Sequence, residues 1–306
     1  MDVNLTRINY YNILGMLVAA CLAIIIPFEL VLISYAILGP LHYFTEISWL
    51  NGKQYFTLKK YDVFVIGAVV LVSILLKLPY SHAIYYAFGL SFILLVIPDT
   101  IMRIIAFVTI VALGYFLLTN NILRTIFGLY LPTLIHVYVF TGSFLLLGAL
   151  KNKTFSGYLA FFTFLICPVM LCVLFTNMHS TPTQWAIHNY KHFANINTTT
   201  LRSKAIDIYN NKASIMLSRF ISFAYTYHYI NWFAKTRVIN WHHITVTRSV
   251  IIGILWIASV GLYFYNYQLA IRWLYILSLA HVILEFPLNH RSFMGIGKEM
   301  RARFAT

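Results

Sequence analysis

Two short stretches of this chain place a histidine and a glutamate four residues apart in apolar surroundings. The first pairs His42 with Glu46, and the second pairs His281 with Glu285. Side chains at this offset share one face of a helix. The chain has only eight acidic residues, and an ionisable residue inside an apolar span indicates a functional site. Histidine with carboxylate is metal-ligand chemistry, so both pairs are candidates for a metal site.

The composition of the chain indicates an integral membrane protein. Its 306 residues are 60% hydrophobic and only 10% charged, and the mean hydropathy is +0.78. The hydrophobic residues form runs of about 20, the length of a helix that crosses a bilayer. No small-residue cleavage site follows the first run, so we expect no cleaved signal peptide.

The net charge of +14 has two explanations. Nucleic-acid binding is the less favoured one, and we expect no nucleic-acid partner. Lys and Arg in cytoplasmic loops orient a membrane protein and can also contact anionic lipid head groups. The three cysteines lie in apolar runs without CxxC spacing, so we expect buried thiols rather than disulfides or zinc ligands.

The apolar runs predict an all-α fold, a polytopic bundle of about ten transmembrane helices within a single membrane domain, 1–306. The predicted helices are 10–26, 28–50, 61–79, 82–98, 100–118, 121–149, 157–176, 214–233, 248–267 and 269–287. The one long polar stretch, 177–213, is predicted to be an interfacial loop with a short amphipathic helix near 185–193.

The distribution of charge predicts an orientation. With ten spans both termini share one side of the membrane, and most Lys and Arg residues of the short loops fall on that side. Because basic loops stay in the cytoplasm, we expect cytoplasmic termini. The basic residues of 177–213 fall on the opposite side, but long loops weigh little in this rule.

Four histidines from four predicted helices fall at roughly one depth in this topology, together with the two glutamates. They are His42, His136, His228 and His281. Neutral imidazole donates nitrogen to iron, zinc or copper, and a cation offsets the cost of a buried carboxylate. We therefore predict that the four histidines hold a metal ion. Glu46 and Glu285 either ligate it or orient an imidazole, and we prefer the orienting role for Glu46.

The other histidines fit a metal site less well. His188 and His192 have ligand spacing on a helix, but they lie in the polar stretch 177–213. We expect interfacial positions for them and for the rest, which are His82, His179, His242, His243 and His290.

Aromatic residues make up 17% of the chain and gather near the candidate ligands. Tyr225, Tyr227, Tyr229 and Trp232 surround His228 in the sequence. These rings can be membrane packing and interface belts, or they can line a slot for a long conjugated or acyl substrate. Their clustering favours an apolar substrate over an ion, with Tyr227 as a candidate catalytic residue.

The histidine motifs resemble those of the bacterial membrane β-carotene dioxygenases (the Blh type). Residues 39–46, Gly-Pro-Leu-His-Tyr-Phe-Thr-Glu, look like their Gly-Leu-Pro-His-Gly-x-x-Asp motif, and residues 280–286 are similar to their late Pro-His-Met-Ile-Leu-Ile-Asp-Phe motif. His136 stands where that family has Ile-His-Phe-Gly, and His228 where it has His-x-x-x-His-Phe. This chain has Glu in place of Asp, and Trp232 in place of the second histidine of the third motif.

The resemblance implies a non-haem iron centre, Fe(2+), on the four histidines and oxidative attack on a polyene. The expected protein is a dioxygenase-like oxidoreductase of a bacterial inner membrane. It would use dioxygen to cleave a lipid-soluble substrate such as a carotenoid to a retinal-like aldehyde, in contact with membrane lipids.

Two other classes of function stay open. A membrane lipid desaturase or hydroxylase needs more HxxxH and HxxHH motifs than this chain has, since only His188-x-x-x-His192 and the His242-His243 doublet are suggestive. A transporter or proton relay would use the same buried His and Glu, with helices broken at Pro40 and Pro132.

Overall fold

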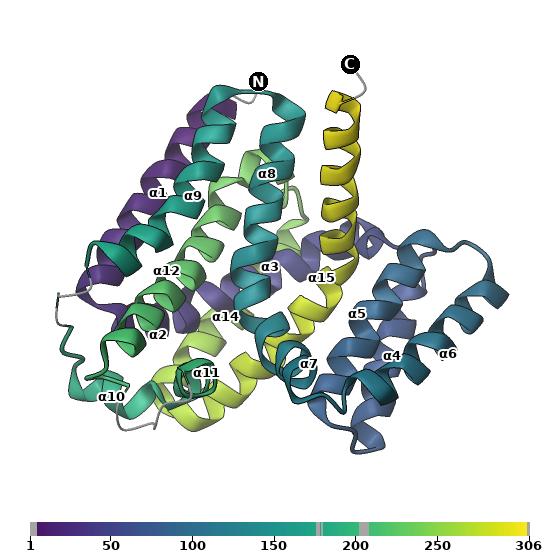
Figure 1. Ribbon diagram of the computed structural model, residues 1–306, viewed down its shortest axis with the longest axis horizontal. Helices are drawn as coiled ribbons and strands as arrows, with labels where there is room; N and C mark the ends of the chain where they lie inside the picture. The colour runs from purple at the N-terminus through teal and green to yellow at the C-terminus, as the bar shows by residue number, and fades with distance from the viewer. Residues whose placement is uncertain (1–4, 176–177, 179, 202–207, 305–306) are drawn as a thin grey trace. The chain divides into compact units, whose positions relative to one another are not determined.

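A computed structural model gives the structure of the chain, and it describes residues 5–175, 178, 180–201 and 208–304. Within these ranges every element of secondary structure is a helix, as Figure 1 shows. The prediction of an all-α fold is therefore confirmed.

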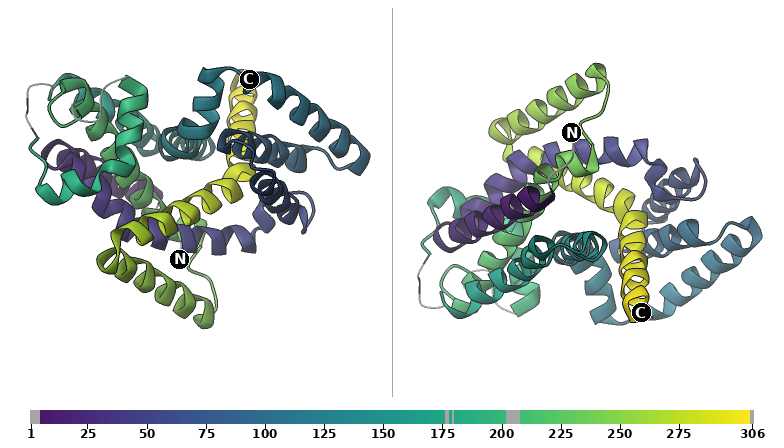
Figure 2. Two further views of the ribbon diagram at one scale, coloured as in Figure 1. Left: turned by 90° about the horizontal axis from the view of Figure 1, so that it is seen from below. Right: turned by 90° about the horizontal axis from the view of Figure 1, so that it is seen from above.

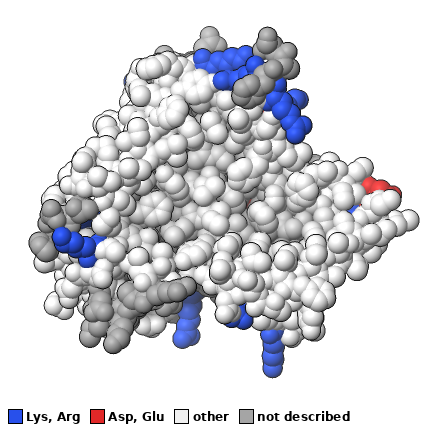
Figure 3. All heavy atoms as spheres, viewed as in Figure 1, with Lys and Arg blue, Asp and Glu red and all other residues white. Residues whose placement is uncertain are grey.

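Seven helical stretches are long and apolar enough to cross a membrane, which is compatible with an integral membrane protein. They are Leu5–Ile25, Pro27–Gly52, Thr100–Leu117, Asn121–Asn152, Phe155–Val173, Val246–Tyr265 and Tyr267–Arg303. On the face shown in Figure 3 most of the surface is uncharged, and the Lys and Arg atoms lie near its edges.

The other three predicted spans form helices that do not meet the requirements for both length and apolarity, so the count of about ten spans is not confirmed. Helices α4 (Asp62–Leu75) and α5 (Tyr80–Val96) have 14 and 17 residues, fewer than the roughly 20 that a bilayer requires. Helix α12 (Lys212–Ala234) has 23 residues but carries many buried polar ones, Arg219 among them.

The chain divides into two compact units. Unit 1 comprises Met1–Thr45 and Thr141–Tyr275, and unit 2 comprises Glu46–Phe140 and Ile276–Thr306. Two helices, α3 (Gly39–Gly52) and α15 (Tyr267–Phe304), contribute residues to both units. The single membrane domain expected from the sequence stays a prediction.

Unit 1 is built around three long helices that pack on one another. Helices α1 (Leu5–Ile25), α9 (Phe155–Val173) and α12 lie side by side in Figure 1 and Figure 2. Around them α8 (Thr141–Asn152) packs on α9, α2 (Pro27–Ile33) packs on α12, and α14 (Val246–Tyr265) packs on the π-helix η1 (Ser34–Leu38).

A buried arginine joins two of these helices. Arg219 of α12 is fully buried and donates to the carbonyl oxygens of Phe175 at 2.5 Å and Met178 at 2.7 Å. Carbonyls at the end of a helix have no donor within that helix. Arg219 therefore provides hydrogen-bond donors to two carbonyls of the segment that follows α9, and it fixes this segment to α12.

The polar stretch 177–213 contains two short helices, α10 (Gln184–Asn189) and α11 (Lys191–Leu201). The buried Asn197 of α11 donates to the hydroxyls of Ser214 and Ser218 at 3.0 and 2.9 Å. The helical part of this stretch is thus packed on α12 through buried polar bonds. Positions 177, 179 and 202–207 lie outside the described residues.

Unit 2 contains three sequential helices, α4, α5 and α6 (Thr100–Leu117), each packed on the next. Arg103 of α6 forms a buried ion pair with Asp62 of α4 at 2.7 Å, which ties the outer two helices together. Helix α5 also packs on α7 (Asn121–Thr125) and on the π-helix η3 (Ile126–Phe140).

The π-helices lie next to two candidate ligands. Residue His136 is within η3, which spans 15 residues and contains Pro132. His42 follows η1 by one turn, in the first residues of α3. Because π-helical turns are rare and frequently occur at functional sites, their positions support a function for both histidines.

Candidate metal centre

Unit 2 brings together two of the predicted ligands. His136 of η3 and His281 of α15 are both buried, and their Nε2 atoms lie 3.0 Å apart. The two residues are 145 positions apart in the chain, so the fold alone creates the pair. Two nitrogens bound at right angles to one ion, each about 2.1 Å from it, are separated by about 3.0 Å. The spacing of the rings therefore fits a shared metal ion.

Glu285 completes a set of three possible ligands. Its Oε2 atom is 3.3 Å from Nδ1 of His136, and its side chain is buried. One potential ligand atom from each of His136, His281 and Glu285 lies within 4.8 Å of the other two. Two histidines and one carboxylate, with coordination positions left open, are the ligands of many non-haem iron oxygenases.

Glu46 adds a second buried carboxylate to unit 2. It is 2% exposed, as is Glu285, so both carboxyl groups are removed from water. Like charges that are removed from water repel each other strongly, and a cation beside them offsets this cost. The predicted role of Glu46, to ligate a metal or to orient an imidazole, fits this environment and stays a prediction.

A third polar side chain of α15 lies one turn beyond Glu285. Asn289 is fully buried, and neither its amide oxygen nor its amide nitrogen has a hydrogen-bond partner among the described residues. It follows His281 and Glu285 at steps of four residues, so the three share one face of the helix. A buried amide without a partner is rare in folded proteins and requires an explanation.

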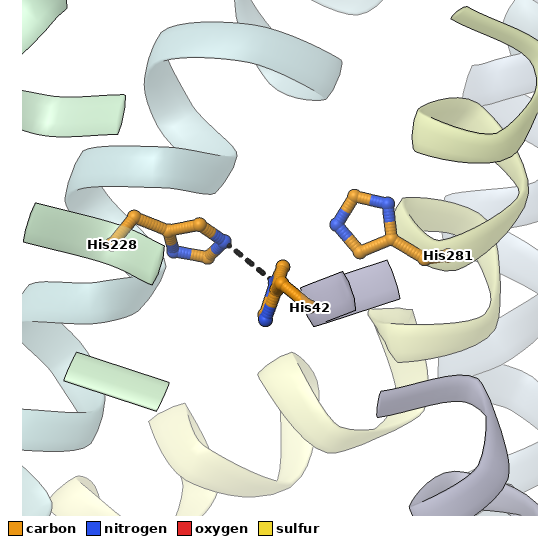
Figure 4. Close-up of side chains that lie close together, drawn as sticks. All are labelled: His42, His228 and His281. Atoms are coloured by element: carbon orange, nitrogen blue, oxygen red, sulfur yellow. Dashed lines mark hydrogen bonds between the residues drawn. The ribbon is translucent and has the colours of Figure 1, made fainter. Parts of the chain in front are cut away.

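Unit 1 brings together the other two predicted ligands. The Nε2 atoms of His42 in α3 and His228 in α12 lie 3.1 Å apart, and Figure 4 shows this bond. On its other side, Nδ1 of His228 bonds the hydroxyl of Thr141 at 2.8 Å. Thr141 could not be predicted from the sequence, because it lies 87 positions from His228 and threonine is a common residue in an apolar run.

Aromatic rings surround the pair in unit 1. The hydroxyls of Tyr43 and Tyr229 bond each other at 2.7 Å, and the ring of Tyr229 lies 5.4 Å from that of His42. Trp232 lies 5.3 Å from the ring of His42 and donates its Nε1 hydrogen to Thr45 at 2.9 Å. Indole nitrogen is only a donor, so Trp232 cannot replace the histidine expected there from the family motif.

Tyr227, predicted as a catalytic residue, is also fully buried. Its hydroxyl donates to the side-chain oxygen of Asn12 in α1 at 3.2 Å, and its ring stacks on Phe223. The described contacts of Tyr227 thus connect α12 to α1. They include no histidine of the candidate site.

The remaining histidines lie elsewhere. His188 is exposed at the end of α10, whereas His192 is in α11, so the expected HxxxH spacing does not fall on one helix. His242 and His243 are exposed neighbours with rings 4.2 Å apart. The buried His290 bonds the backbone carbonyl of Phe88 at 2.9 Å. His179 lies outside the described residues.

The structure thus brings the four predicted histidines together as two pairs, one in each unit. A single centre that uses all four stays a prediction, because the pairs belong to different units. No protein-family model matches the chain, and no curated protein or solved structure is significantly similar to it.

Proposed function

We propose that this chain is a membrane non-haem iron oxygenase that acts on a lipid-soluble polyene such as a carotenoid. The observation that carries the proposal is the buried set of His136, His281 and Glu285 in unit 2. A hydrated divalent ion would bind through two imidazole nitrogens and one carboxylate oxygen, which is the ligand set that suits Fe(2+). The sequence prediction adds His42 and His228 as further ligands.

The protein's own residues have distinct roles in this proposal. His136 and His281 supply neutral nitrogen ligands, and Glu285 supplies a negatively charged carboxylate oxygen. Thr141 orients the ring of His228 through the hydrogen bond between its hydroxyl and Nδ1. Glu46 balances the charge of the ion from a buried position.

The substrate class follows from the surroundings of the histidines. Tyr43, Tyr229 and Trp232 offer an apolar, aromatic environment beside His42, and such rings suit a flat conjugated chain. Bound iron supplies the one-electron chemistry that lets dioxygen attack such a chain. Cleavage of one C=C bond by one dioxygen gives two carbonyl ends, so no further reductant is required.

The resemblance to the bacterial β-carotene dioxygenases supports the same function, through the motifs around His42 and His281. It also supports a bacterial inner membrane location. The seven long apolar stretches are compatible with such a location, and the basic short loops favour cytoplasmic termini.

The proposal is tested by expressing the chain in bacterial cells that make β-carotene. We expect the pigment to bleach and a retinal-like aldehyde to accumulate, and the protein purified in detergent to contain about one iron per chain. His281→Ala should abolish both, while His290→Ala, a buried histidine of the same helix, should retain both. Iron below about 0.2 per chain in the wild type, with no other transition metal, would overturn the proposal.

A further inference from the structure

A groove on unit 2 has no role in the proposed chemistry. It has a volume of about 550 Å³, within the usual range for small-molecule sites. Its walls come from the beginning of α4, from the residues that follow α3, and from Leu284 of α15. All of these belong to unit 2.

Three polar residues, Asn51, Gln54 and Lys60, line the groove and offer two amides and one cation. We call this part of the lining the polar end. The nearest acid along the chain, Asp62, is already engaged. It accepts from the backbone nitrogen of Lys59 at 2.9 Å and pairs with Arg103 at 2.7 Å. The ammonium group of Lys60 therefore does not have its charge neutralised by Asp62 and can receive an anion.

Helix α4 contributes apolar lining residues, Phe64, Gly67 and Ala68, and Phe64 is 69% exposed. We call this part of the lining the apolar end. Gly67 lies five residues after the start of α4, which is about 7.5 Å along the helix. A Cβ atom on Gly67 would meet no atom within 4 Å, so this part of the groove is open. The lining of the groove thus combines a cationic part with an apolar part.

A strained turn holds the polar end in place. Gln54, Tyr55 and Phe56 have φ values of 50°, 52° and 58°, in the left-handed region that residues with a Cβ avoid. The ring of Phe56 is packed on Trp49 at 5.4 Å and lies under the guanidinium of Arg291 at 5.3 Å. Strain of this kind persists where the surroundings enforce it, commonly at binding sites.

We propose that this groove binds a membrane phospholipid with an anionic head group. Lys60 receives the phosphate, the amides of Asn51 and Gln54 bond its oxygens, and an acyl chain lies along Phe64, Gly67 and Ala68. A hydrocarbon polyene offers nothing to the lysine, and a small soluble anion leaves the apolar end uncovered. The site is independent of the proposed oxygenase function.

The experiment measures retained lipid by native mass spectrometry after transfer of the full-length protein into vesicles. The vesicles contain phosphatidylcholine alone or phosphatidylcholine mixed with phosphatidylglycerol. We expect the wild type to retain phosphatidylglycerol preferentially and Lys60→Gln to reduce this retention about fivefold, the effect of one lysine near an anionic head group. Lys77→Gln, an exposed lysine just beyond the other end of α4, is the matched control and should bind like the wild type.

A second variant tests the apolar end without changing charge. Gly67→Leu should fill the groove and reduce retention of both lipids, while circular dichroism shows the helix content of the wild type. Equal lipid retention by Lys60→Gln and the wild type would overturn the proposal. Thermal stabilisation by inorganic phosphate alone that is lost in Lys60→Gln would overturn it as well, in favour of a soluble anion.

Discussion

The two histidine pairs have nearly the same geometry but different partners. Their Nε2 atoms are 3.0 Å apart in unit 2 and 3.1 Å apart in unit 1. In unit 2 the Nδ1 atom of His136 faces the carboxylate of Glu285, whereas in unit 1 the Nδ1 atom of His228 faces the hydroxyl of Thr141. Glu285 adds a third possible ligand, and a negatively charged one, beside the pair in unit 2. The pair in unit 2 is therefore the better candidate for a metal site, and the pair in unit 1 is the more aromatic one.

The largest effect is expected from removing a ligand in unit 2. His281→Ala leaves His136 and Glu285 alone, so we expect iron content to fall from about one per chain to under about 0.2 and product formation to disappear. Elemental analysis of the purified protein and chromatography of cell extracts measure the two outcomes. The same loss in His290→Ala would point to general disruption of α15 instead.

A ligand removed from unit 1 should have a smaller effect on iron. We expect His42→Ala to weaken iron retention by roughly 10- to 100-fold, less than His281→Ala, because the three ligands of unit 2 remain. Titration with a chelator of known affinity measures this difference. Iron binding unchanged from the wild type would show that His42 does not take part in the centre.

The orienting hydroxyl of unit 1 is tested by Thr141→Val. The substitution keeps the shape of the side chain and removes the bond to Nδ1 of His228, so we expect a loss of about tenfold in turnover. Thr141→Ser restores the hydroxyl and should recover most of the activity. If Val and Ser behave alike, the hydroxyl has no orienting role.

Asn289 is a position in unit 2 where the effects of a substitution on stability and on function can be measured separately. A buried amide without a partner costs about 1–3 kcal/mol, so Asn289→Leu is expected to raise the melting temperature. If the amide serves the centre, the same variant loses iron affinity or turnover. Thermal unfolding in detergent and iron titration measure the two effects. A lower melting temperature with full activity would assign Asn289 an ordinary packing role.

The smallest effect is expected at the tyrosine pair of unit 1. Tyr43→Phe removes one buried hydroxyl bond and leaves Tyr229 without it, so stability should fall by about 1 kcal/mol. Iron content should not change, because no metal candidate loses an atom. Loss of iron in Tyr43→Phe would show that the metal centre also depends on the aromatic residues around His42.

Much of the helical pattern could be predicted from the sequence. Each of the ten predicted stretches contains a helix, although 28–50 and 121–149 also contain π-helix, and the Leu5–Ile25 and Thr100–Leu117 helices end close to the expected positions. A hydrophobic run indicates apolarity and not the length of the helix. Helix α4 ends at Leu75, before Lys77 with its φ of 54°, although the predicted helix continued to position 79. The aromatic residues of helix α12 make its sequence look apolar. Ser218 and Arg219 of this helix nevertheless bond buried polar partners, and the mean hydropathy of a stretch cannot detect such bonds.

The candidate site could be predicted only in part. The spacing of His281 and Glu285 identified two groups that the structure places near His136, since both lie on one helix. Thr141 and Asn289 could not be found, because their importance depends on which distant atoms face them. The π-helical geometry around His136 also has no signature in a hydrophobic run, because the run reports apolarity and not the number of residues in each turn.

The π-helix η3 has a consequence for how this chain can change over evolution. Loss of one residue from Ile126–Phe140 would rotate everything after it about the helix axis, and Thr141 follows directly. Insertions and deletions in this segment would thus alter chemistry, in contrast to those in an ordinary connecting loop. Functional relatives should keep the count of residues between Asn121 and Thr141 even where the identities differ, and this fixed length offers a way to recognise them.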